Sequence, residues 1–303
     1  MPTMKIGIIG LGRMGANIAR RLMRAGHGVS AFDLDQAACG TLAAEGCAIH
    51  ASVAAMVAEP APRVIWVMLP AGKVTEATLD ELRATLAPRD TVIEGGNSHY
   101  KDTQRRAKAF KEHGIDYIDC GTSGGVWGLE SGYSLMLGGD AAAIERCRPI
   151  FEALAPGRDR GWGRVGPSGA GHFAKMVHNG IEYGLMQAYA EGFAILQKKS
   201  ELGIDLNQVA GIWQHGSVVR SWLLELIAGA LADNPSLEGI APYVSDSGEG
   251  RWTVQEAVDL DVAAPVITLS LLQRLASREP DAFSDKLLAA MRRQFGGHAV
   301  RTK

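Results

Sequence analysis

Four polar side chains recur at helical spacing in the middle of the chain. They are Lys175, His178, Asn179 and Glu182. Positions i, i+3, i+4 and i+7 lie on one face of a helix, two turns deep, and such side chains can carry acid–base chemistry. The flanking residues are apolar, so the polar stripe is expected to face a cleft. A solvated face with a lysine and a glutamate seven residues apart would show the same pattern, and the spacing alone does not choose between the two.

A glycine-rich turn near the N-terminus indicates a dinucleotide site. It consists of Gly10, Leu11, Gly12, Arg13, Met14 and Gly15, and it follows a strand-like run and opens a helical pattern. In that position the glycines permit a tight turn and close backbone approach, while free N–H groups and the helix dipole receive a pyrophosphate. The strand and helix around the turn make a plain, ligand-free turn the less favoured interpretation.

A carboxylate about 20 residues beyond the glycines indicates which dinucleotide binds. Asp33 ends the second predicted strand, where it can accept hydrogen bonds from the adenosine ribose hydroxyls. A 2′-phosphate would instead meet the charges of Asp33 and Asp35, with no arginine between them. The sequence therefore predicts NAD, although Asp33 could simply cap the next helix. We also place at the cofactor Leu69, Pro70, Ala71 and Asn97.

Short β-branched runs alternate with helical patterns through the first half of the chain, which predicts a parallel sheet covered by helices on both faces. The expected strands are residues 5–10, 29–32, 64–68, 91–94, 117–119 and 134–137. Helices are expected between them, for instance over residues 16–25 and 102–113. The predicted fold class is α/β, a doubly wound Rossmann sheet.

After Pro167 the strand signal fades and long apolar-periodic helices follow. They are expected over residues 170–200, 217–232, 253–260, 262–276 and 281–295, so the second domain should be all-helical. The boundary is expected in the glycine-, proline- and arginine-rich stretch 156–171. We predict an NAD-binding domain over residues 1–165 and a helical substrate and dimerisation domain, with a C-terminal tail, over residues 166–303.

The composition excludes several functional classes. The 303 residues are 47% hydrophobic, which suffices for a large core and about two domains. A formal charge of -2 supplies no basic field for nucleic acid or acidic lipid. Four scattered cysteines predict reduced thiols and no metal site. Charges interrupt the apolar run 181–196, and the first strand leaves no room for a signal peptide, so we expect a cytoplasmic protein without membrane spans.

From the glycine turn to the C-terminus the sequence resembles the 6-phosphogluconate dehydrogenases, in particular their short NAD-linked branch. The matching segments are residues 10–15, 94–98, 121–125, 171–183 and 292–298, which follow one another in family order over nearly the whole chain. The wider 3-hydroxyacid dehydrogenase family shares the glycine turn, a Ser-Gly-Gly-like segment and the helical lysine. The His-Asn pair at 178–179, the Glu-Tyr pair at 182–183 and the C-terminal Phe-Gly-Gly-His are typical of the 6-phosphogluconate enzymes.

The resemblance implies oxidation and decarboxylation of 6-phosphogluconate to ribulose 5-phosphate. Lys175 would be the general base and then the acid, Glu182 would protonate the product carbon, and Asn179 completes the catalytic set. Asn97 would lie between the nicotinamide and the substrate, and the sugar acid would be held by Ser123, Gly124, Gly125, His178, Asn179 and Tyr183. Oxidation at C3 places a ketone β to the carboxylate, so loss of CO2 requires no metal once the carbonyl oxygen is hydrogen-bonded. Lys175 must start neutral, and burial beside the cationic nicotinamide would lower its pKa.

The phosphate end departs from the longer family members. Their glycine-rich segment with a phosphate-binding lysine is shortened here to residues 246–252, with Glu249 and no matching lysine. The resemblance leaves as phosphate ligands Arg292, Tyr183 and His298. The missing charge would come from Arg251, Arg274 or Arg278, of which we assign Arg278 to the substrate. The alternative is that Arg274 and Arg278 are ordinary surface arginines without a ligand.

The C-terminal segment 292–303 is expected to follow the last helix, because its glycines do not suit a helix interior. In the family such a tail reaches into the neighbouring subunit's cleft, which implies a homodimer or homotetramer with a shared site. A frayed terminus is the alternative.

Two other functions stay open. A non-decarboxylating 3-hydroxyacid dehydrogenase, acting on hydroxyisobutyrate or tartronate semialdehyde, would have no role for Glu182 and no phosphate site. A protein that senses or binds NAD without turnover would need none of Lys175, Asn179 and Glu182, so their joint presence argues against it.

Overall fold

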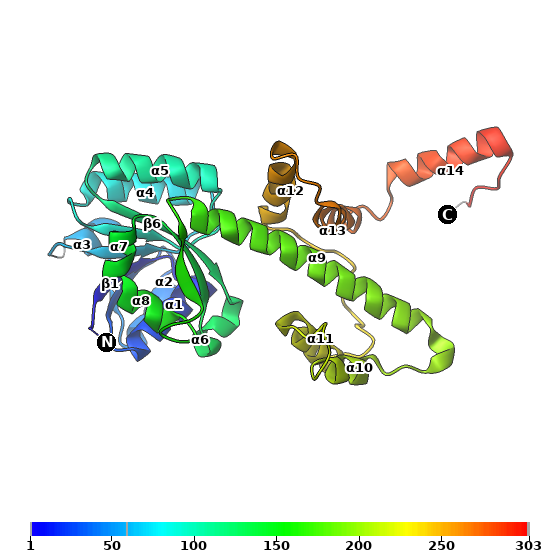
Figure 1. The fold of residues 1–303 in the computed structure, drawn as a ribbon, viewed down its shortest axis with the longest axis horizontal. Coiled ribbons are helices and arrows are strands. Elements are labelled where there is room, and N and C mark those ends of the chain that lie inside the picture. The colour runs from blue at the N-terminus through cyan, green and yellow to red at the C-terminus, as the bar shows by residue number, and fades with distance from the viewer. Residues whose placement is uncertain (1, 59, 302–303) are drawn as a thin grey trace. The chain divides into compact units, whose positions relative to one another are not determined.

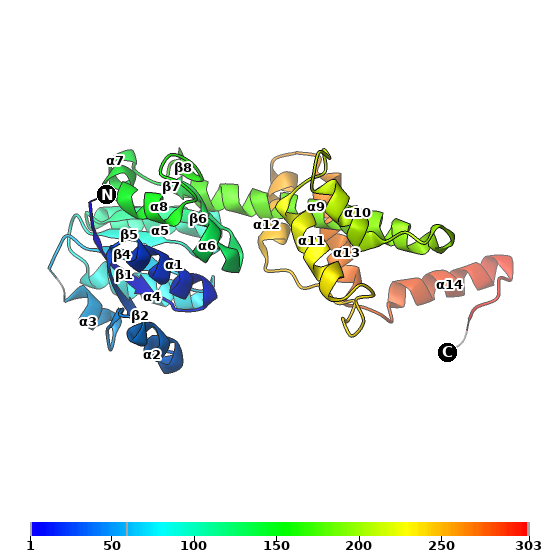
Figure 2. The same cartoon turned by 90° about the horizontal axis from the view of Figure 1, so that it is seen from below.

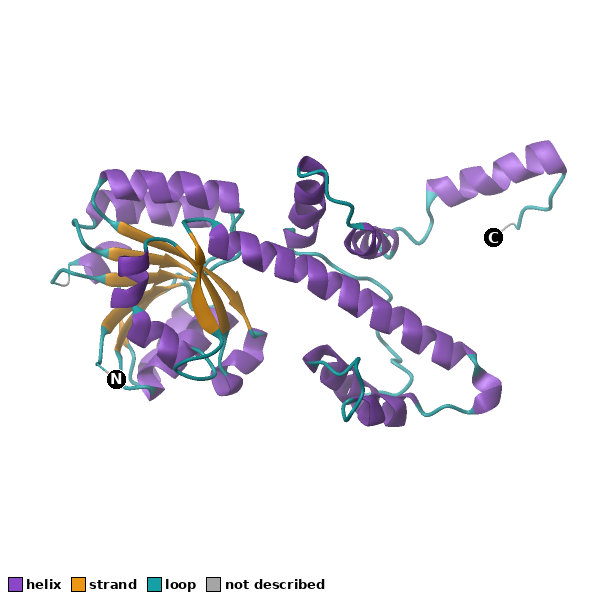
Figure 3. Cartoon of the chain, in the orientation of Figure 1, coloured by secondary structure: helices purple, strands orange, loops and turns teal. Residues whose placement is uncertain are grey.

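The computed structural model describes residues 2–58 and 60–301. Contacts within the chain divide it into two units, Met1–His178 and Asn179–Lys303. Strands occur in the first unit, and the described residues of the second form helices and loops (Figures 1 and 3).

The first unit is built on an eight-stranded sheet of described residues with the order β3-β2-β1-β4-β5-β6-β7-β8. The strands are β1 (Lys5–Ile9), β2 (Gly28–Phe32), β3 (Ala48–Ile49), β4 (Val64–Val67), β5 (Thr91–Glu94), β6 (Asp116–Ser123), β7 (Ser134–Gly138) and β8 (Trp162–Gly166). The strand order reverses between β1 and β4, and sheets of this kind bind dinucleotides at the carboxyl ends of the strands beside such a switch point. The predicted doubly wound α/β fold is confirmed.

The observed sheet differs from the predicted one in the direction of one strand and in two additional strands. Strand β7 runs antiparallel to β6, whereas the sequence pattern predicted parallel strands throughout. Only residues 124–133 separate the two strands, and a parallel connection needs a crossover of about a dozen residues or more. Strands β3 and β8 were not predicted, and β8 lies inside the stretch 156–171 that was expected to connect two domains.

Helices cover both faces of the sheet. They are α1 (Arg13–Arg24), α2 (Gln36–Ala44), α3 (Val53–Val57), α4 (Lys73–Thr85), α5 (Tyr100–Glu112), α6 (Gly128–Ser131), α7 (Ala141–Arg146) and α8 (Arg148–Leu154). Helices α4 and α5 lie side by side, joined by ion pairs from Arg105 and Arg106 to Glu76 (Figures 1 and 2). On the other face, Arg21 of α1 donates to the carbonyls of Ala153 and Leu154 at the end of α8.

The side chains of β1 point alternately to the two faces of the sheet, and each face has its own hydrophobic core. Ile8 packs in the cluster that contains Leu22 of α1 and Phe151 of α8, whereas Ile9 packs in the cluster that contains Leu82 of α4 and Phe110 of α5. Successive side chains of a strand point to opposite faces, so a strand buried on both sides is apolar throughout. This explains the unbroken apolar runs in the sequence.

Helix α9 (Ala170–Lys198) begins in the first unit, and the division between the units falls inside it. The other helices of the second unit are α10 (Leu206–Trp213), α11 (Trp222–Asp233), α12 (Glu249–Asp259), α13 (Pro265–Ala276) and α14 (Phe283–Gly296). A small core joins Phe193 of α9, Ala210 of α10 and Leu224 of α11.

The helices of the second unit differ from the predicted ones in several places, and α12 begins at Glu249 rather than at residue 253. Helix α10 was not predicted, and α11 begins at Trp222 rather than at residue 217, because the side chain of Ser221 accepts from the amide of Leu224 and caps the helix there. Helix α14 continues to Gly296 and ends where Gly297 adopts a left-handed conformation, with φ of 64°. Arg292 therefore lies on the last helix and not after it.

Candidate active site

The glycine turn between β1 and α1 has the geometry of a dinucleotide site. Gly10 has a φ of 97°, and a Cβ there would lie 2.3 Å from the carbonyl oxygen of Met68. A Cβ at Gly15 would lie 1.9 Å from the carbonyl oxygen of Gly10, whereas a Cβ at Gly12 would meet nothing within 4 Å. No side chain caps the start of α1, so its first N–H groups are available to a pyrophosphate.

Asp33 follows β2 and lies against this turn. Its carboxylate accepts from the backbone N–H of Leu11 at 2.5 Å and from that of Asp35 at 2.8 Å. The helix cap is Asp35, whose side chain accepts from the amide of Ala37 at the start of α2. The neighbouring Leu34 is 83% exposed. Together the turn, the open helix start and Asp33 fit a nicotinamide dinucleotide, with the carboxylate placed for ribose hydroxyls.

The loops after β4 and β5 lie together at the same edge of the sheet. A Cβ at Gly96 would lie 2.6 Å from the carbonyl oxygen of Leu69, so these two loops touch. The hydroxyl of Thr75 donates to the carbonyl of Pro70 at 2.7 Å and fixes the first loop to α4. Asn97, in the second loop, is exposed.

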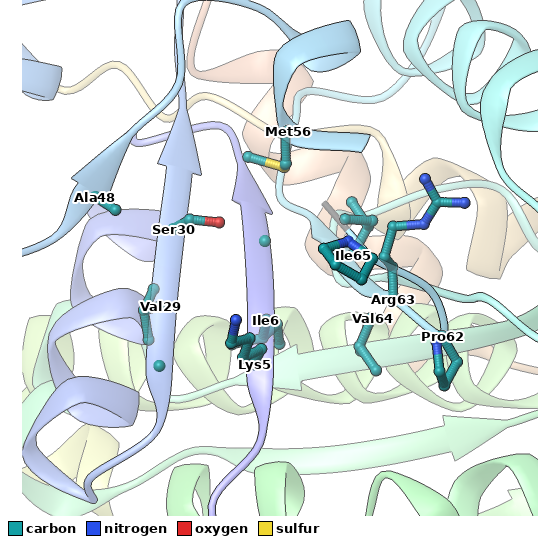
Figure 4. Close-up of a pocket in the computed structure, with 13 residues that line it drawn as sticks. Lys5, Ile6, Val29, Ser30, Ala48, Met56, Pro62, Arg63, Val64 and Ile65 are labelled. Atoms are coloured by element: carbon teal, nitrogen blue, oxygen red, sulfur yellow. The ribbon is translucent and has the colours of Figure 1, made fainter. Parts of the chain in front are cut away.

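A separate hollow occurs at the opposite edge of the sheet (Figure 4). It is lined by the amino ends of β1, β2 and β4, where Lys5, Val29 and Val64 lie, and by Met56. The parallel strands carry the glycine turn at their carboxyl ends, so this hollow is not the dinucleotide site.

Helix α9 meets β6 at two glycines. A Cβ at Gly121 would lie 2.5 Å from the Cβ of Lys175 and 2.6 Å from the carbonyl oxygen of Gly171. Lys175 is 8% exposed. One turn further along the helix, Nε2 of His178 lies 3.3 Å from the hydroxyl of Ser123. Within the first unit, the fold thus brings Ser123 next to Lys175 and His178, which lie more than 50 residues further along the chain.

The end of β6 leads into a turn that only glycine fits easily. Gly124 and Gly125 have φ angles of 135° and 53°. A Cβ at Gly124 would lie 3.1 Å from the ring of Tyr133, while one at Gly125 would meet nothing within 4 Å. The backbone beside Ser123 is therefore open to a ligand at Gly125.

In the second unit, Tyr183 of α9 is surrounded by the loop before α12 and by α13. Tyr183 is 6% exposed, and its hydroxyl accepts from the backbone N–H of Ser247 at 3.3 Å. The guanidinium of Arg274 lies over its ring, 3.5 Å from the centroid. A Cβ at Gly250 would lie 2.4 Å from the same ring. Asn179 is 8% exposed and Glu182 is half-buried on the same helix.

Asp246 joins the other two arginines of this loop region. Its carboxylate accepts from Arg251 at 3.0 Å and from Arg278 at 2.7 Å, and Arg278 also donates to the carbonyl of Val244. These hydrogen bonds, that of Arg251 first, lower the pKa of Asp246 to about 2. The sequence pattern does not single out Asp246, because Arg278 lies 32 residues away from it and no local pattern links the two.

The C-terminal candidates lie at and beyond the end of α14. Arg292 and His298 are exposed, and among the described residues no hydrogen bond joins Arg292 to Tyr183. The side chain of Phe295 lies outside the described part of the chain. The pairing of these residues with a phosphate stays a prediction.

Among the described residues, no group of three or more His, Cys, Asp or Glu is arranged to hold a metal ion, and no helix has the length and apolarity to cross a membrane. All four cysteines are free and buried. Burial raises the pKa of Cys47 to about 11 and that of Cys120 and Cys147 to about 12, so these thiols are poor nucleophiles.

A dinucleotide turn at the switch point of a Rossmann sheet, followed by a long helix with a buried lysine, defines a pyridine-nucleotide-dependent oxidoreductase. Residues 5–163 match the family model described as the NAD binding domain of 6-phosphogluconate dehydrogenase. Residues 171–282 match the model of the 6-phosphogluconate dehydrogenase C-terminal domain. The chain belongs to the 6-phosphogluconate dehydrogenase family.

Two relatives that match over nearly their whole length support this assignment, and two solved structures are similar in fold. A putative 6-phosphogluconate dehydrogenase of Bacillus subtilis is 44% identical over 99% of this chain and 100% of its own length. An NAD(+)-dependent, decarboxylating 6-phosphogluconate dehydrogenase of Haloferax volcanii is 46% identical over 99% of both chains. The Plasmodium falciparum 6-phosphogluconate dehydrogenase structure is 27% identical, with a TM-score of 0.83 over 99% of this chain and 66% of that one. A Mycobacterium tuberculosis 3-hydroxyisobutyrate dehydrogenase is 26% identical, with a TM-score of 0.73 over 89% and 91%.

Proposed function

We propose that this protein catalyses the NAD-dependent oxidative decarboxylation of 6-phospho-D-gluconate to D-ribulose 5-phosphate, CO2 and NADH. The observation that carries the proposal is the placement of buried Lys175 against Gly121 of β6, beside the pair formed by Ser123 and His178. A buried lysine next to groups that bind hydroxyls is suited to take a proton from a sugar alcohol. A decarboxylating relative with 46% identity supports the same reaction.

In the proposed reaction, residues of helix α9 carry out the proton transfers. Lys175, neutral at the start, accepts the C3 hydroxyl proton as the hydride leaves C3, and the bound nicotinamide supplies the hydride acceptor. Lys175 then returns that proton to the C3 carbonyl oxygen as the bond to the C1 carboxylate breaks and CO2 departs. Glu182 protonates the former C2 of the resulting enediol, and Lys175 again removes the hydroxyl proton to leave the ketone. Asn179 hydrogen-bonds the substrate in the catalytic set.

Substrate binding divides between two groups of residues. In the first unit we assign the sugar acid to Asn97, Ser123, Gly124, Gly125 and His178. In the second unit we assign the phosphate to Tyr183, Arg278, Arg292 and His298. Arg274 lies on the ring of Tyr183, which makes it a further candidate for the phosphate.

The cofactor and assembly are part of the same proposal. Asp33 and Asp35 favour NAD over NADP because a 2′-phosphate would add charge beside two carboxylates. Exposed apolar side chains on α14, such as Phe283 and Leu288, support a homodimer or homotetramer in which a second copy covers this helix. The domain bounds 1–165 and 166–303 and the cytoplasmic location stay predictions.

A single assay tests the reaction. NADH formation and CO2 release are measured with 6-phosphogluconate, with gluconate and 3-hydroxyisobutyrate as controls. We expect equal amounts of both products from 6-phosphogluconate and little from the controls. NADH without CO2, or a preference for 3-hydroxyisobutyrate, would contradict the proposal and favour a non-decarboxylating 3-hydroxyacid dehydrogenase.

A further inference from the structure

A buried histidine one turn before Lys175 has no part in the reaction proposed above. His172 is 2% exposed, and its Nδ1 lies 2.7 Å from the hydroxyl oxygen of Thr103, a fully buried residue in the first turn of α5. Thr103 also donates its hydroxyl proton to the carbonyl of His99 at 3.3 Å. Because that proton is already used, the Thr103 oxygen accepts from Nδ1–H of His172. Among the described residues, Nε2 of His172 has no hydrogen-bond partner.

The backbone of the same helical turn is held from the other side by Asp119 of β6. One carboxylate oxygen accepts from the N–H of Gly169 at 2.8 Å and the other from the N–H of His172 at 3.0 Å. Asp119 is fully buried, and a Cβ at Gly138 would lie 2.5 Å from both of its carboxylate oxygens. The carboxylate thus fits beside β7 because Gly138 has no side chain, and it caps the start of α9.

These contacts tie the start of α9 to two elements at once. Asp119 attaches it to β6, and Thr103 attaches it to α5, the helix that follows the loop with Asn97. We propose that Asp119, His172 and Thr103 form a positioning network that fixes Lys175 relative to β6 and to the Asn97 loop. The three residues act through Lys175 and not on the substrate. The inference rests on the proposed function, in which Lys175 must reach the C3 hydroxyl.

The first test is Thr103→Val, which keeps the shape of the side chain and removes the acceptor for Nδ1–H. The start of α9 should loosen, and a displacement of the base by a fraction of an ångström to 1 Å lowers kcat by roughly 10- to 100-fold. The KM for NAD should stay within about twofold, because the glycine turn is untouched. Hydrogen exchange at the amides of residues 169–175 should become faster, a readout that does not depend on activity.

Two substitutions at residue 172 distinguish the role of Nδ1 from that of Nε2. In His172→Asn the side-chain amide nitrogen occupies the place of Nδ1 and can still donate to Thr103, whereas in His172→Gln it occupies the place of Nε2. We expect His172→Asn to retain kcat to within roughly threefold and His172→Gln to fall as far as Thr103→Val. In the Thr103→Val background, His172→Asn should restore nothing, because the two residues act through one hydrogen bond.

Thr91→Val is the matched control. Thr91 is 3% exposed, and it lies at the start of β5, the end of that strand away from Asn97. Its loss should leave kcat and the exchange at residues 169–175 unchanged. The inference would be overturned if Thr103→Val kept the wild-type kcat and the wild-type exchange rates. It would also be overturned if His172→Gln retained kcat while His172→Asn lost it. If the wild-type protein fails to turn over 6-phosphogluconate, the proposed function fails, while faster exchange in Thr103→Val still supports the tether and unchanged exchange still refutes it.

Discussion

The carboxylate of Asp33 lies between the glycine turn and the start of α2, with the exposed side chain of Leu34 next to it. Wild-type kcat/KM should favour NAD over NADP by about a hundredfold, because a 2′-phosphate would approach two carboxylates in a partly screened site. The double variant Asp33→Asn with Leu34→Arg removes one charge and adds a cation, so it should lower this preference at least about tenfold. Steady-state kinetics with both cofactors measure it.

The control for this prediction is Asp140→Asn. Asp140 caps α7 in the same unit, and asparagine is an equally good cap, so cofactor preference should not change. Equal kcat/KM for NAD and NADP in the wild-type protein would refute the assignment of Asp33.

Glu182 is expected to act only after oxidation and loss of CO2. Glu182→Gln preserves the shape of the side chain and has no acidic proton, so kcat should fall about a hundredfold or more, while the KM for 6-phosphogluconate changes less than about threefold. The variant should also lose exchange of the C1 proton of ribulose 5-phosphate with solvent, which NMR can follow. Glu191→Gln, an exposed position on the same helix, is the control. A raised KM with unchanged kcat would make Glu182 a binding residue.

At the scale of elements, the position of α9 depends on close contact between its first turn and the sheet. A Cβ at Gly171 would lie 2.4 Å from the carbonyl oxygen of Met136 and 2.7 Å from that of Asp119. Gly171→Ala must therefore move the helix start away from β6 and β7, and we expect it to lower the free energy of unfolding by about 1 to 3 kcal/mol. Urea denaturation measures this change, and kcat should fall with it because Lys175 moves too.

The same helix supplies the control. A Cβ at Gly192 would meet nothing within 4 Å, so Gly192→Ala should raise the free energy of unfolding by up to about 1 kcal/mol, as expected for removing a glycine from a helix interior. If Gly171→Ala proves as stable and as active as Gly192→Ala, the contact with the sheet does not set the position of α9.

At the scale of the whole molecule, Arg292 can serve either the site of its own chain or that of a second copy. Helix α14 carries exposed apolar side chains, among them Phe283, Leu287 and Leu288, together with Arg292. A helix with such a surface gains stability when another surface covers it. We expect the second copy of the chain to do so, and the phosphate of its substrate to meet Arg292 of the neighbour.

Subunit mixing tests this arrangement. The variants Lys175→Ala and Arg292→Ala should each be inactive or nearly so with 6-phosphogluconate. After subunit exchange, a mixed dimer would hold one cleft with both residues intact, and activity should return to about a quarter of the wild-type value at equal mixing, a statistical estimate for one competent cleft in half of the dimers. A mixture that has exchanged subunits and stays inactive would show that each tail serves its own chain.

The sequence by itself determined the features that depend only on residues close together in the chain. The glycine turn, Asp33 and the strands on either side lie within one β-α-β segment, so their spacing along the chain suffices to predict the fold class. The polar stripe of α9 follows in the same way from helical periodicity. Helix ends were less predictable, because caps such as Ser221 and the left-handed Gly297 compete with periodicity over a single turn.

Only the tertiary structure decided which distant groups meet. The antiparallel pairing of β6 with β7, the two arginines on Asp246, and the bonds of His172 to Thr103 join positions that no local pattern connects. Thr103 and His172 are 69 residues apart, and each alone looks like an ordinary helical residue. Their burial against each other follows from packing α5 and α9 on one sheet. The close approach of Lys175 to Gly121 likewise exists because a glycine there allows the helix to touch the strand.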